Sequence, residues 1–156
     1  MSNSHGWQMK VRLALESDAD AIVSMARTNM EQTRPTLTFN EARCRATIQN
    51  YLAFASPTIF VVEDKGEVTG MLVCDFYEHR AADGHFCVQE VLFVRPDKRG
   101  TRAAALLMRE LVAWAQTIGA NEIVGGNDNE FNSDQTARFL GRFGFKRVGH
   151  AMRRDV

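Results

Sequence analysis

Alternating apolar and polar positions predict strands and helices along nearly the whole sequence. Val11 and Leu13 alternate with charged or small neighbours, which is typical of a half-buried strand at residues 9–15. Two amphipathic helices are expected next, because capping patterns at Ser17 and Thr38 each precede apolar side chains with helical spacing. The elements expected after them are strands at 58–64, 68–77 and 86–94, a helix at 103–118, a strand at 121–125, a helix at 133–144 and a last strand within 145–154.

Composition restricts the class of protein to which the chain belongs. Its 156 residues, 45% hydrophobic and 24% charged, predict one globular domain over 1–156, with residues 1–8 as a loose tail. Lys plus Arg and Asp plus Glu both number 19, so no charge excess favours nucleic acid or an anionic membrane. No apolar run resembles a signal peptide or a membrane span, so a cytoplasmic protein is expected. Three widely spaced cysteines indicate neither a disulfide framework nor a zinc site.

The strongest chemical signal is the segment FVRPDKRGTRAAALLM, in which a strand leads through a basic loop directly into a helix. Free N–H groups and the helix dipole make such a terminus an anion site, to which Arg99 and Arg102 would add charge-assisted hydrogen bonds. The residues small enough to let a phosphate approach the backbone are Gly100, Ala103 and Ala104. The local residues alone leave two interpretations open, a diphosphate site and a solvated basic turn.

Three segments resemble the GNAT superfamily of acyl-CoA-dependent N-acyltransferases: KVRLALESDADAIVSMA, QEVLFVRPDKRGTRAAALLMREL and SDQTARFLGRFGFKRVG. The resemblance covers nearly the whole chain. It implies an α+β fold of the three-layer type, with a mixed, mostly antiparallel central sheet of about six to seven strands flanked by four helices. It also implies acetyl-CoA as co-substrate without a metal and an amine-bearing acceptor, and it is compatible with a homodimer.

The resemblance also assigns the residues that would bind the cofactor. In the family an Arg/Gln-x-x-Gly-x-Gly/Ala loop binds the pyrophosphate, and here Arg102 stands where the first glycine is usual, as in a phage-like subgroup with an RGxRAA loop. We expect Arg102 to add a cationic contact there; the alternative is that its side chain crowds the phosphate. The loop residues implied are Arg99, Gly100, Thr101, Arg102, Ala103 and Ala104. The other implied contacts are the main chains of Leu92, Phe93 and Val94, with Ser133 at the family's asparagine position.

Glu90 matches the carboxylate that serves as general base in the family, where a water often relays the proton. Regular alternation would put its side chain on one face with Val88 and Leu92, partly buried. The alternative is a glutamate that is solvated or paired with an arginine. Cys87 is expected on the opposite face, and His79 and His85 are expected on the surface.

The usual acid of the family, a tyrosine in the last helix, is missing. Gly144-Phe145 sets the register and places Leu140 at that position, and the tyrosines present, Tyr51 and Tyr77, are each expected in the core or at its rim. This absence and the altered glycine keep open a CoA-binding regulatory module without catalysis. A third hypothesis is a small interaction domain whose basic loop docks an acidic partner. The sequence identifies no acceptor.

Overall fold

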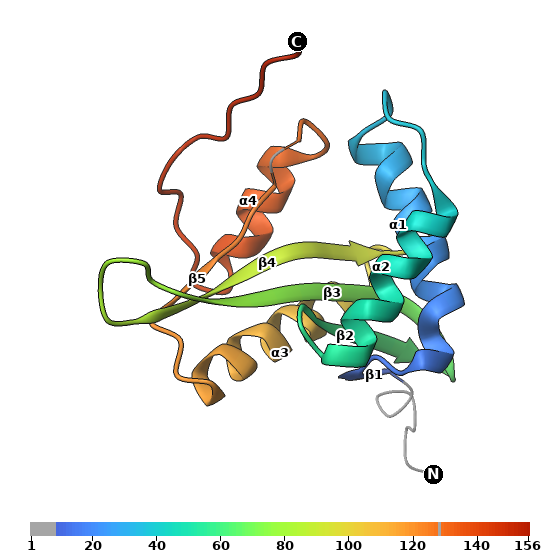
Figure 1. Cartoon of the computed structure of the whole chain (residues 1–156), viewed down its shortest axis with the longest axis horizontal. Helices are drawn as coiled ribbons and strands as arrows, with labels where there is room; N and C mark the ends of the chain where they lie inside the picture. The colour runs from blue at the N-terminus through green and yellow to red at the C-terminus, as the bar shows by residue number, and fades with distance from the viewer. Residues whose placement is uncertain (1–8, 128) are drawn as a thin grey trace.

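The computed structural model describes residues 9–127 and 129–156, so the tail expected at 1–8 lies outside the described residues. Its regular elements follow the predicted order as far as α4 (Figure 1). The strands are β1 (Met9–Leu13), β2 (Thr58–Asp64), β3 (Glu67–Glu78), β4 (His85–Val94) and β5 (Glu122–Val124). The helices are α1 (Ala19–Thr33), α2 (Glu41–Phe54), α3 (Ala103–Thr117) and α4 (Ser133–Gly141), with short 3₁₀ turns at Glu16–Asp18 and Pro96–Lys98.

The strands form one sheet in the order β1-β2-β3-β4-β5. Neighbours are antiparallel from β1 to β4, whereas β4 and β5 are parallel, because α3 carries the chain back between them. The β2–β3 hairpin turns at Lys65 and Gly66, whose φ angles are both positive, at 54° and 79°. Two positive φ angles match the twist of paired strands, which confirms the turn expected there.

Helices cover both faces of the sheet (Figure 1). One face packs against α1 and α2, and the other packs mainly against α3, with Leu140 of α4 joining it. The core residues on the α1/α2 face include Ile22, Val23, Ile48, Val61, Met71, Val73 and Phe93. Those on the α3 face include Phe60, Val62, Leu72, Cys74, Val94, Leu107, Met108 and Leu111. The predicted three-layer arrangement is therefore confirmed.

The sheet has five strands in the described part, not six to seven, because no strand forms within 145–154. Val148 and Met152 are 87% and 94% exposed, so this segment lacks a partner edge. The edge available to it is short, since β5 has only three residues. A strand without a ladder of inter-strand hydrogen bonds is not stable, which explains why an apolar pattern here gives no strand.

The helix ends also differ from expectation. Asn40, not Thr38, caps α2, and its side chain accepts a hydrogen bond from the N–H of Arg43. Ser17 caps nothing, whereas Asp18 accepts from the N–H of Leu15. Helix α4 ends at Gly141, three residues earlier than expected. Ser, Thr, Asn and Asp are all good N-cap residues, so a sequence with several of them close together does not show which one caps the helix. The local backbone geometry decides between them.

Candidate active site

Strands β4 and β5 run side by side over only three residue pairs. The last pair joins Val88 to Val124, and β4 continues for six residues beyond it, to Val94. Figure 1 shows β5 leading away from β4 towards α4. The second half of β4 therefore has an open edge on the side away from β3. Unpaired backbone groups of this kind can pair with an extended ligand.

The hydrogen-bond pattern identifies which main-chain groups point to that open edge. The N–H of Arg95 donates to the carbonyl of Thr69 at 2.9 Å, so Val94 belongs to a pair that is not hydrogen bonded to β3. The N–H and C=O of Val94, and by alternation those of Leu92, are directed to the open edge, where the Val94 carbonyl already accepts a hydrogen bond from Nε of Arg99. Phe93 differs from expectation, because its main chain faces β3 and its side chain is buried under α1 and α2.

The loop after β4 has the backbone features that an anion site needs. Gly100 has φ +82°, and nothing lies within 4 Å of the position that a Cβ would occupy. The hydroxyl of Thr101 donates to the carbonyl of Lys98 at 2.7 Å and accepts from the N–H of Ala103 at 3.3 Å, which fixes the turn. Among the described residues, the N–H groups of this loop and of the first turn of α3 that have no acceptor are those of Gly100, Thr101, Arg102, Ala104 and Ala105. No acidic residue stands in the first turn of α3.

The side chain of Arg99 is exposed, and it also contacts three segments of the protein. Its Nε donates to the carbonyl of Val94 at 3.0 Å, and its Nη2 donates to Oε1 of Gln32 on α1 at 2.9 Å. The guanidinium also lies 5.4 Å from the ring centre of Phe93 and 5.9 Å from that of Phe131. Arg99 thus links the end of β4 to α1 and to the loop between β5 and α4.

Two other predicted residues have structural partners of their own. Ala103 is fully buried against the sheet, so its small size serves packing under α3, not the approach of a phosphate as expected. Ser133 donates to the carbonyl of Asn129 at 2.8 Å and accepts from Nδ2 of Asn127 at 3.1 Å. Ser133 therefore orders the loop between β5 and α4. Ala104 is only partly buried, and its N–H is available at the start of α3.

Arg102 differs from Arg99, because its exposed side chain has no hydrogen bond or ion pair with any described residue. We expect Arg102→Ala to weaken acetyl-CoA binding about tenfold, the loss of one charge-assisted contact, without lowering the melting temperature of the free protein. Arg99→Ala should weaken acetyl-CoA binding and also lower the melting temperature, because its side chain contacts three segments of the protein. Titration calorimetry and thermal melts separate the two effects. Tighter binding by Arg102→Ala would show that its side chain crowds the phosphate.

Glu90 is the extra residue of a β-bulge. Val91 pairs with Val73 and Gln89 with Cys74, so Glu90 has no partner on β3. A bulge shifts the alternation of side chains, which places Leu92 on the α3 face while Glu90 lies on the other. The expectation that Glu90 shares a face with Leu92 is therefore wrong. Its expected partial burial is also wrong, because the side chain is exposed.

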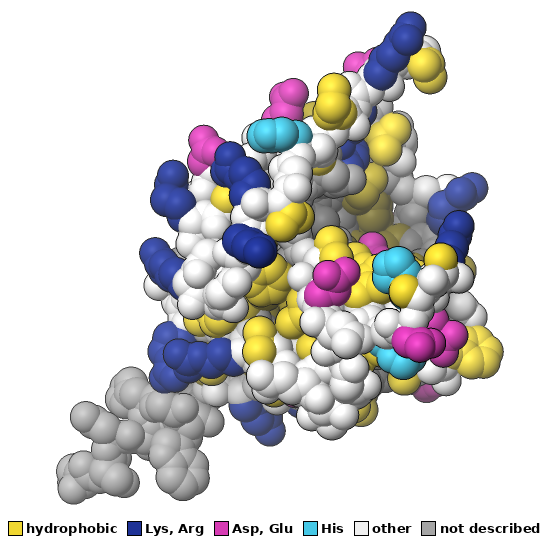
Figure 2. All heavy atoms as spheres, turned by 90° about the vertical axis from the view of Figure 1, so that its left-hand side faces the viewer, with side chains coloured by type: hydrophobic (Ala, Val, Ile, Leu, Met, Phe, Trp, Pro, Cys, Tyr) yellow, Lys and Arg dark blue, Asp and Glu magenta, His cyan; other side chains and the backbone are white. Residues whose placement is uncertain are grey.

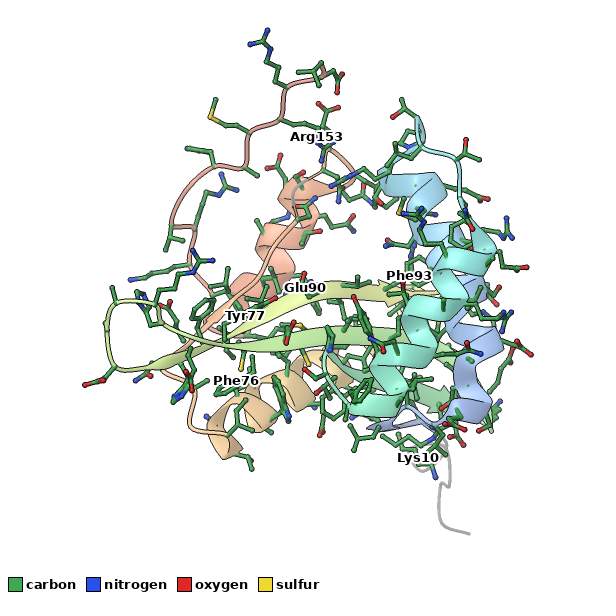
Figure 3. The ribbon with its side chains drawn as sticks, viewed as in Figure 1. Lys10, Phe76, Tyr77, Glu90, Phe93 and Arg153 are labelled. Carbon is green, nitrogen blue, oxygen red and sulfur yellow. The ribbon has the colours of Figure 1, made fainter. Side chains whose placement is uncertain are left out.

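Tyr77 stands between two carboxylates on this face. Its hydroxyl donates to Oδ2 of Asp75 at 3.0 Å and lies 3.4 Å from Oε1 of Glu90. Figure 3 shows Tyr77 and Glu90 side by side on β3 and β4. The hydrogen bond to Asp75, aided by the nearby negative charges, raises the pKa of Tyr77 to about 12. Tyr77 therefore keeps its proton across the neutral and mildly basic range.

The remaining candidates contribute packing. Leu140 is 4% exposed and belongs to the core, so a buried leucine fills the position of the missing acid. Cys87 is fully buried on the α3 face, opposite Glu90 as expected, and burial raises the pKa of its thiol. His85 stacks on Phe76 with ring centres 4.9 Å apart, at the exposed end of the β3–β4 hairpin. None of these side chains offers a nucleophile or an acid beside Glu90.

A large open cavity lies on the α4 side of the molecule, and Glu90, Tyr77 and Gly100 are not among its lining residues. Its volume is about 1420 Å³, and its walls come from the end of α1 with the following loop, the loop between β5 and α4, α4 itself and the C-terminal segment. Figure 2 shows hydrophobic side chains exposed in a recess on this side of the molecule, with Lys and Arg along one margin. The cavity includes Gln32, Phe131 and Ser133, so it adjoins the Arg99 contacts. This volume can hold a large ligand.

Sequence reasoning missed Asp75 and the position of Tyr77. The pattern Asp75-x-Tyr77 puts both side chains on one face of β3, which alternation does predict. Their meeting with Glu90 depends on the bulge in β4, which no residue pattern marks. Gln32 was also missed, because its contact with Arg99 spans 67 positions in sequence.

Within 9–127 and 129–156, no three His, Cys, Asp or Glu side chains gather as a metal ion would need. No helix of that part is both long and apolar enough to cross a membrane.

Solved structures with this arrangement are numerous. A transcriptional regulator from Bacillus halodurans C-125 aligns with TM-score 0.79 and 16% identity, covering 95% of this chain and 99% of its own. The aminoglycoside N-acetyltransferase AAC(6')-Iy in complex with CoA gives 0.75 and 15%, covering 95% and 94%. A predicted acetyltransferase with acetyl-CoA from Clostridium acetobutylicum gives 0.73 and 16%, covering 94% and 96%. Identities this low show the shared fold alone.

A search of curated proteins finds no match to the sequence. The model of the acetyltransferase (GNAT) family, by contrast, matches residues 20–145, which is most of the chain. This match contains the open edge of β4, the loop at Gly100 and the bulge at Glu90. The chain therefore belongs to the GNAT family of acetyltransferases.

Proposed function

We propose that the protein is an N-acetyltransferase that transfers an acetyl group from acetyl-CoA to a primary amine of a small molecule or peptide by direct attack. The observation that carries the proposal is the open edge of β4, where Leu92 and Val94 present main-chain groups. This edge leads directly to the free N–H groups of the loop at Gly100. Family membership and the CoA and acetyl-CoA complexes of similar folds support the same co-substrate.

Acetyl-CoA fits the residues that are present. The open space at Gly100 admits a phosphate to the backbone, and the N–H groups of Thr101, Arg102 and Ala104 supply donors. Arg102 is exposed and forms no ion pair with any described residue, so its charge is available to a phosphate. The pantetheine arm would lie along Leu92 and Val94, in the manner of an added strand.

The bound thioester supplies an activated acetyl group, and the chain supplies positioning and proton transfer. Glu90 accepts the proton that the acceptor amine must lose before or during attack, directly or through a water. The N–H of Leu92 donates to the oxygen on which negative charge develops. No acid is needed at Leu140, because a thiolate is a good leaving group near neutral pH.

A CoA-binding regulatory module without catalysis is the second candidate. It is favoured by the buried Leu140 at the acid position and by Arg102 at the glycine position. Both proposals require cofactor binding, so binding alone does not separate them. Release of CoA in the presence of an amine does.

The test has two stages. Acetyl-CoA at about 100 times its dissociation constant should stabilise the protein by roughly 2.7 kcal/mol, visible as a higher melting temperature. Release of free CoA is then measured with amines, polyamines, amino acids, aminoglycosides and peptide N-termini. Stabilisation without release for any acceptor would favour the regulatory module, and no stabilisation would contradict both. A cytoplasmic location and a homodimer stay predictions.

A further inference from the structure

Three side chains lie within hydrogen-bonding distance of one another in a row on the face of the sheet that carries Glu90. Tyr77 donates to Asp75 at 3.0 Å, and its oxygen lies 3.4 Å from Glu90 (Figure 3). Asp75 and Tyr77 come from β3 and Glu90 from the bulge in β4, so the strand pairing itself holds the path together. Tyr77 is further fixed by stacking on Phe86, with ring centres 5.5 Å apart.

The direction of these bonds determines what the path can do. A tyrosine hydroxyl has one proton to donate and a lone pair to accept with. Both carboxylates lie within reach of that single proton, and Asp75 is the nearer acceptor, at 3.0 Å against 3.4 Å for Glu90. With the proton donated to Asp75, the Tyr77 oxygen presents a lone pair towards Glu90. An ionised Glu90 has no proton to share with that lone pair. Once Glu90 has taken a proton, its O–H can donate to Tyr77, and the three groups then form an aligned chain.

Resting on the proposed acetyl transfer, we propose that Tyr77 and Asp75 are a proton relay for Glu90. The ammonium proton moves to a carboxylate oxygen of Glu90. The Glu90 O–H bond then breaks as the proton joins the Tyr77 oxygen, while the Tyr77 proton passes to Asp75. Asp75 releases it to water, which restores all three groups. No oxidant, metal or further reactant is needed.

The surroundings suit such a path. Tyr77 is 41% exposed and Asp75 is half-buried, so the path ends near solvent. An acceptor bound over Glu90 would cover that carboxylate from water, which makes a second exit for the proton useful. The raised pKa of Tyr77, about 12, keeps the hydroxyl protonated, so it passes protons on and does not act as a phenolate base.

The relay is tested by steady-state kinetics on Tyr77→Phe, Asp75→Asn and the double variant. Each single variant should lower kcat about tenfold and leave KM for acetyl-CoA and for the acceptor unchanged, because the groups move a proton and bind neither substrate. The double variant should be no slower than either single one, since both break the same path. Tyr51→Phe, which removes a hydroxyl from α2, is the matched control and should keep full turnover.

Each outcome decides between explanations. Full turnover in Tyr77→Phe, or multiplied losses in the double variant, would overturn the relay while leaving acetyl transfer intact. A raised KM for the acceptor with unchanged kcat would overturn it in favour of an acceptor-binding role. Absence of turnover in the wild type with every amine would overturn the proposed function and the relay together. Acetyl-CoA stabilisation of each variant equal to that of the wild type shows that folding and cofactor binding are preserved.

Discussion

Glu90→Gln should lower kcat about 100-fold or more while leaving the affinity for acetyl-CoA nearly unchanged. The amide keeps the shape of the side chain but cannot accept a proton, so the acceptor amine stays protonated at the moment of attack. Binding is preserved because Leu92, Val94 and the loop at Gly100 provide the contacts proposed for acetyl-CoA. Steady-state assays of CoA release, with calorimetry for acetyl-CoA, measure the two effects separately.

The matched control is Glu122→Gln on the neighbouring strand β5, where an exposed glutamate lies outside the path from Asp75 to Glu90. It should behave as the wild type does. Equal losses in both variants would indicate a general electrostatic effect and not a base at Glu90. Wild-type turnover in Glu90→Gln would move the base to another residue or leave the amine to deprotonate in solution.

The pH dependence of the wild type provides an independent check on the same site. The rate should rise with pH as the amine becomes neutral and then reach a plateau. An essential tyrosine acid with an ordinary pKa would cause a fall near pH 10. No such fall is expected, because Leu140 fills the acid position and the hydrogen bond to Asp75 raises the pKa of Tyr77 to about 12.

Gly100→Val should weaken acetyl-CoA binding at least 100-fold, more than either arginine substitution. Gly100 has φ +82°, a conformation that costs a β-branched residue on the order of 1–3 kcal/mol, so the loop would shift. The new side chain would also fill the open space through which a phosphate reaches the backbone N–H groups. Titration calorimetry with acetyl-CoA measures the loss.

Gly119→Val provides the control for backbone strain. Gly119 has φ +75°, also with nothing within 4 Å of a Cβ, but it lies at the opposite end of α3. Both variants should therefore lose stability in thermal melts, and only Gly100→Val should lose binding. Similar affinity losses in the two would mean that general destabilisation explains the effect. Wild-type affinity in Gly100→Val would place the diphosphate elsewhere.

Much of the fold could be predicted because it depends on local signals. Hydrophobic periodicity marked the helices and the long strands, and Lys65-Gly66 marked the hairpin turn. The prediction of a last strand was wrong for a physical reason. A strand needs a neighbouring strand edge to pair with, and apolar residues such as Val148 cannot supply one. The segment 145–154 therefore had a suitable pattern and no sheet to join.

The candidate site also has features that local sequence signals predict and features that depend on tertiary contacts. The residues themselves indicate an anion site or a solvated basic turn at Gly100, whereas the base role of Glu90 and the choice of a diphosphate for the loop come from the resemblance to the family. The different surroundings of Arg99 and Arg102 could not be predicted from the sequence, because contacts such as that of Arg99 with Gln32 join residues far apart in the chain.

By itself the sequence determined the order of elements, the position of the basic loop before α3 and the leucine at the acid position. Only the tertiary structure decided that Glu90 stands in a bulge, faces Tyr77 and Asp75, and lies opposite Leu92. The physical reason is that a bulge arises from the pairing of two strands. One extra residue reverses the faces that alternation assigns, and nothing within a single strand records where that residue lies.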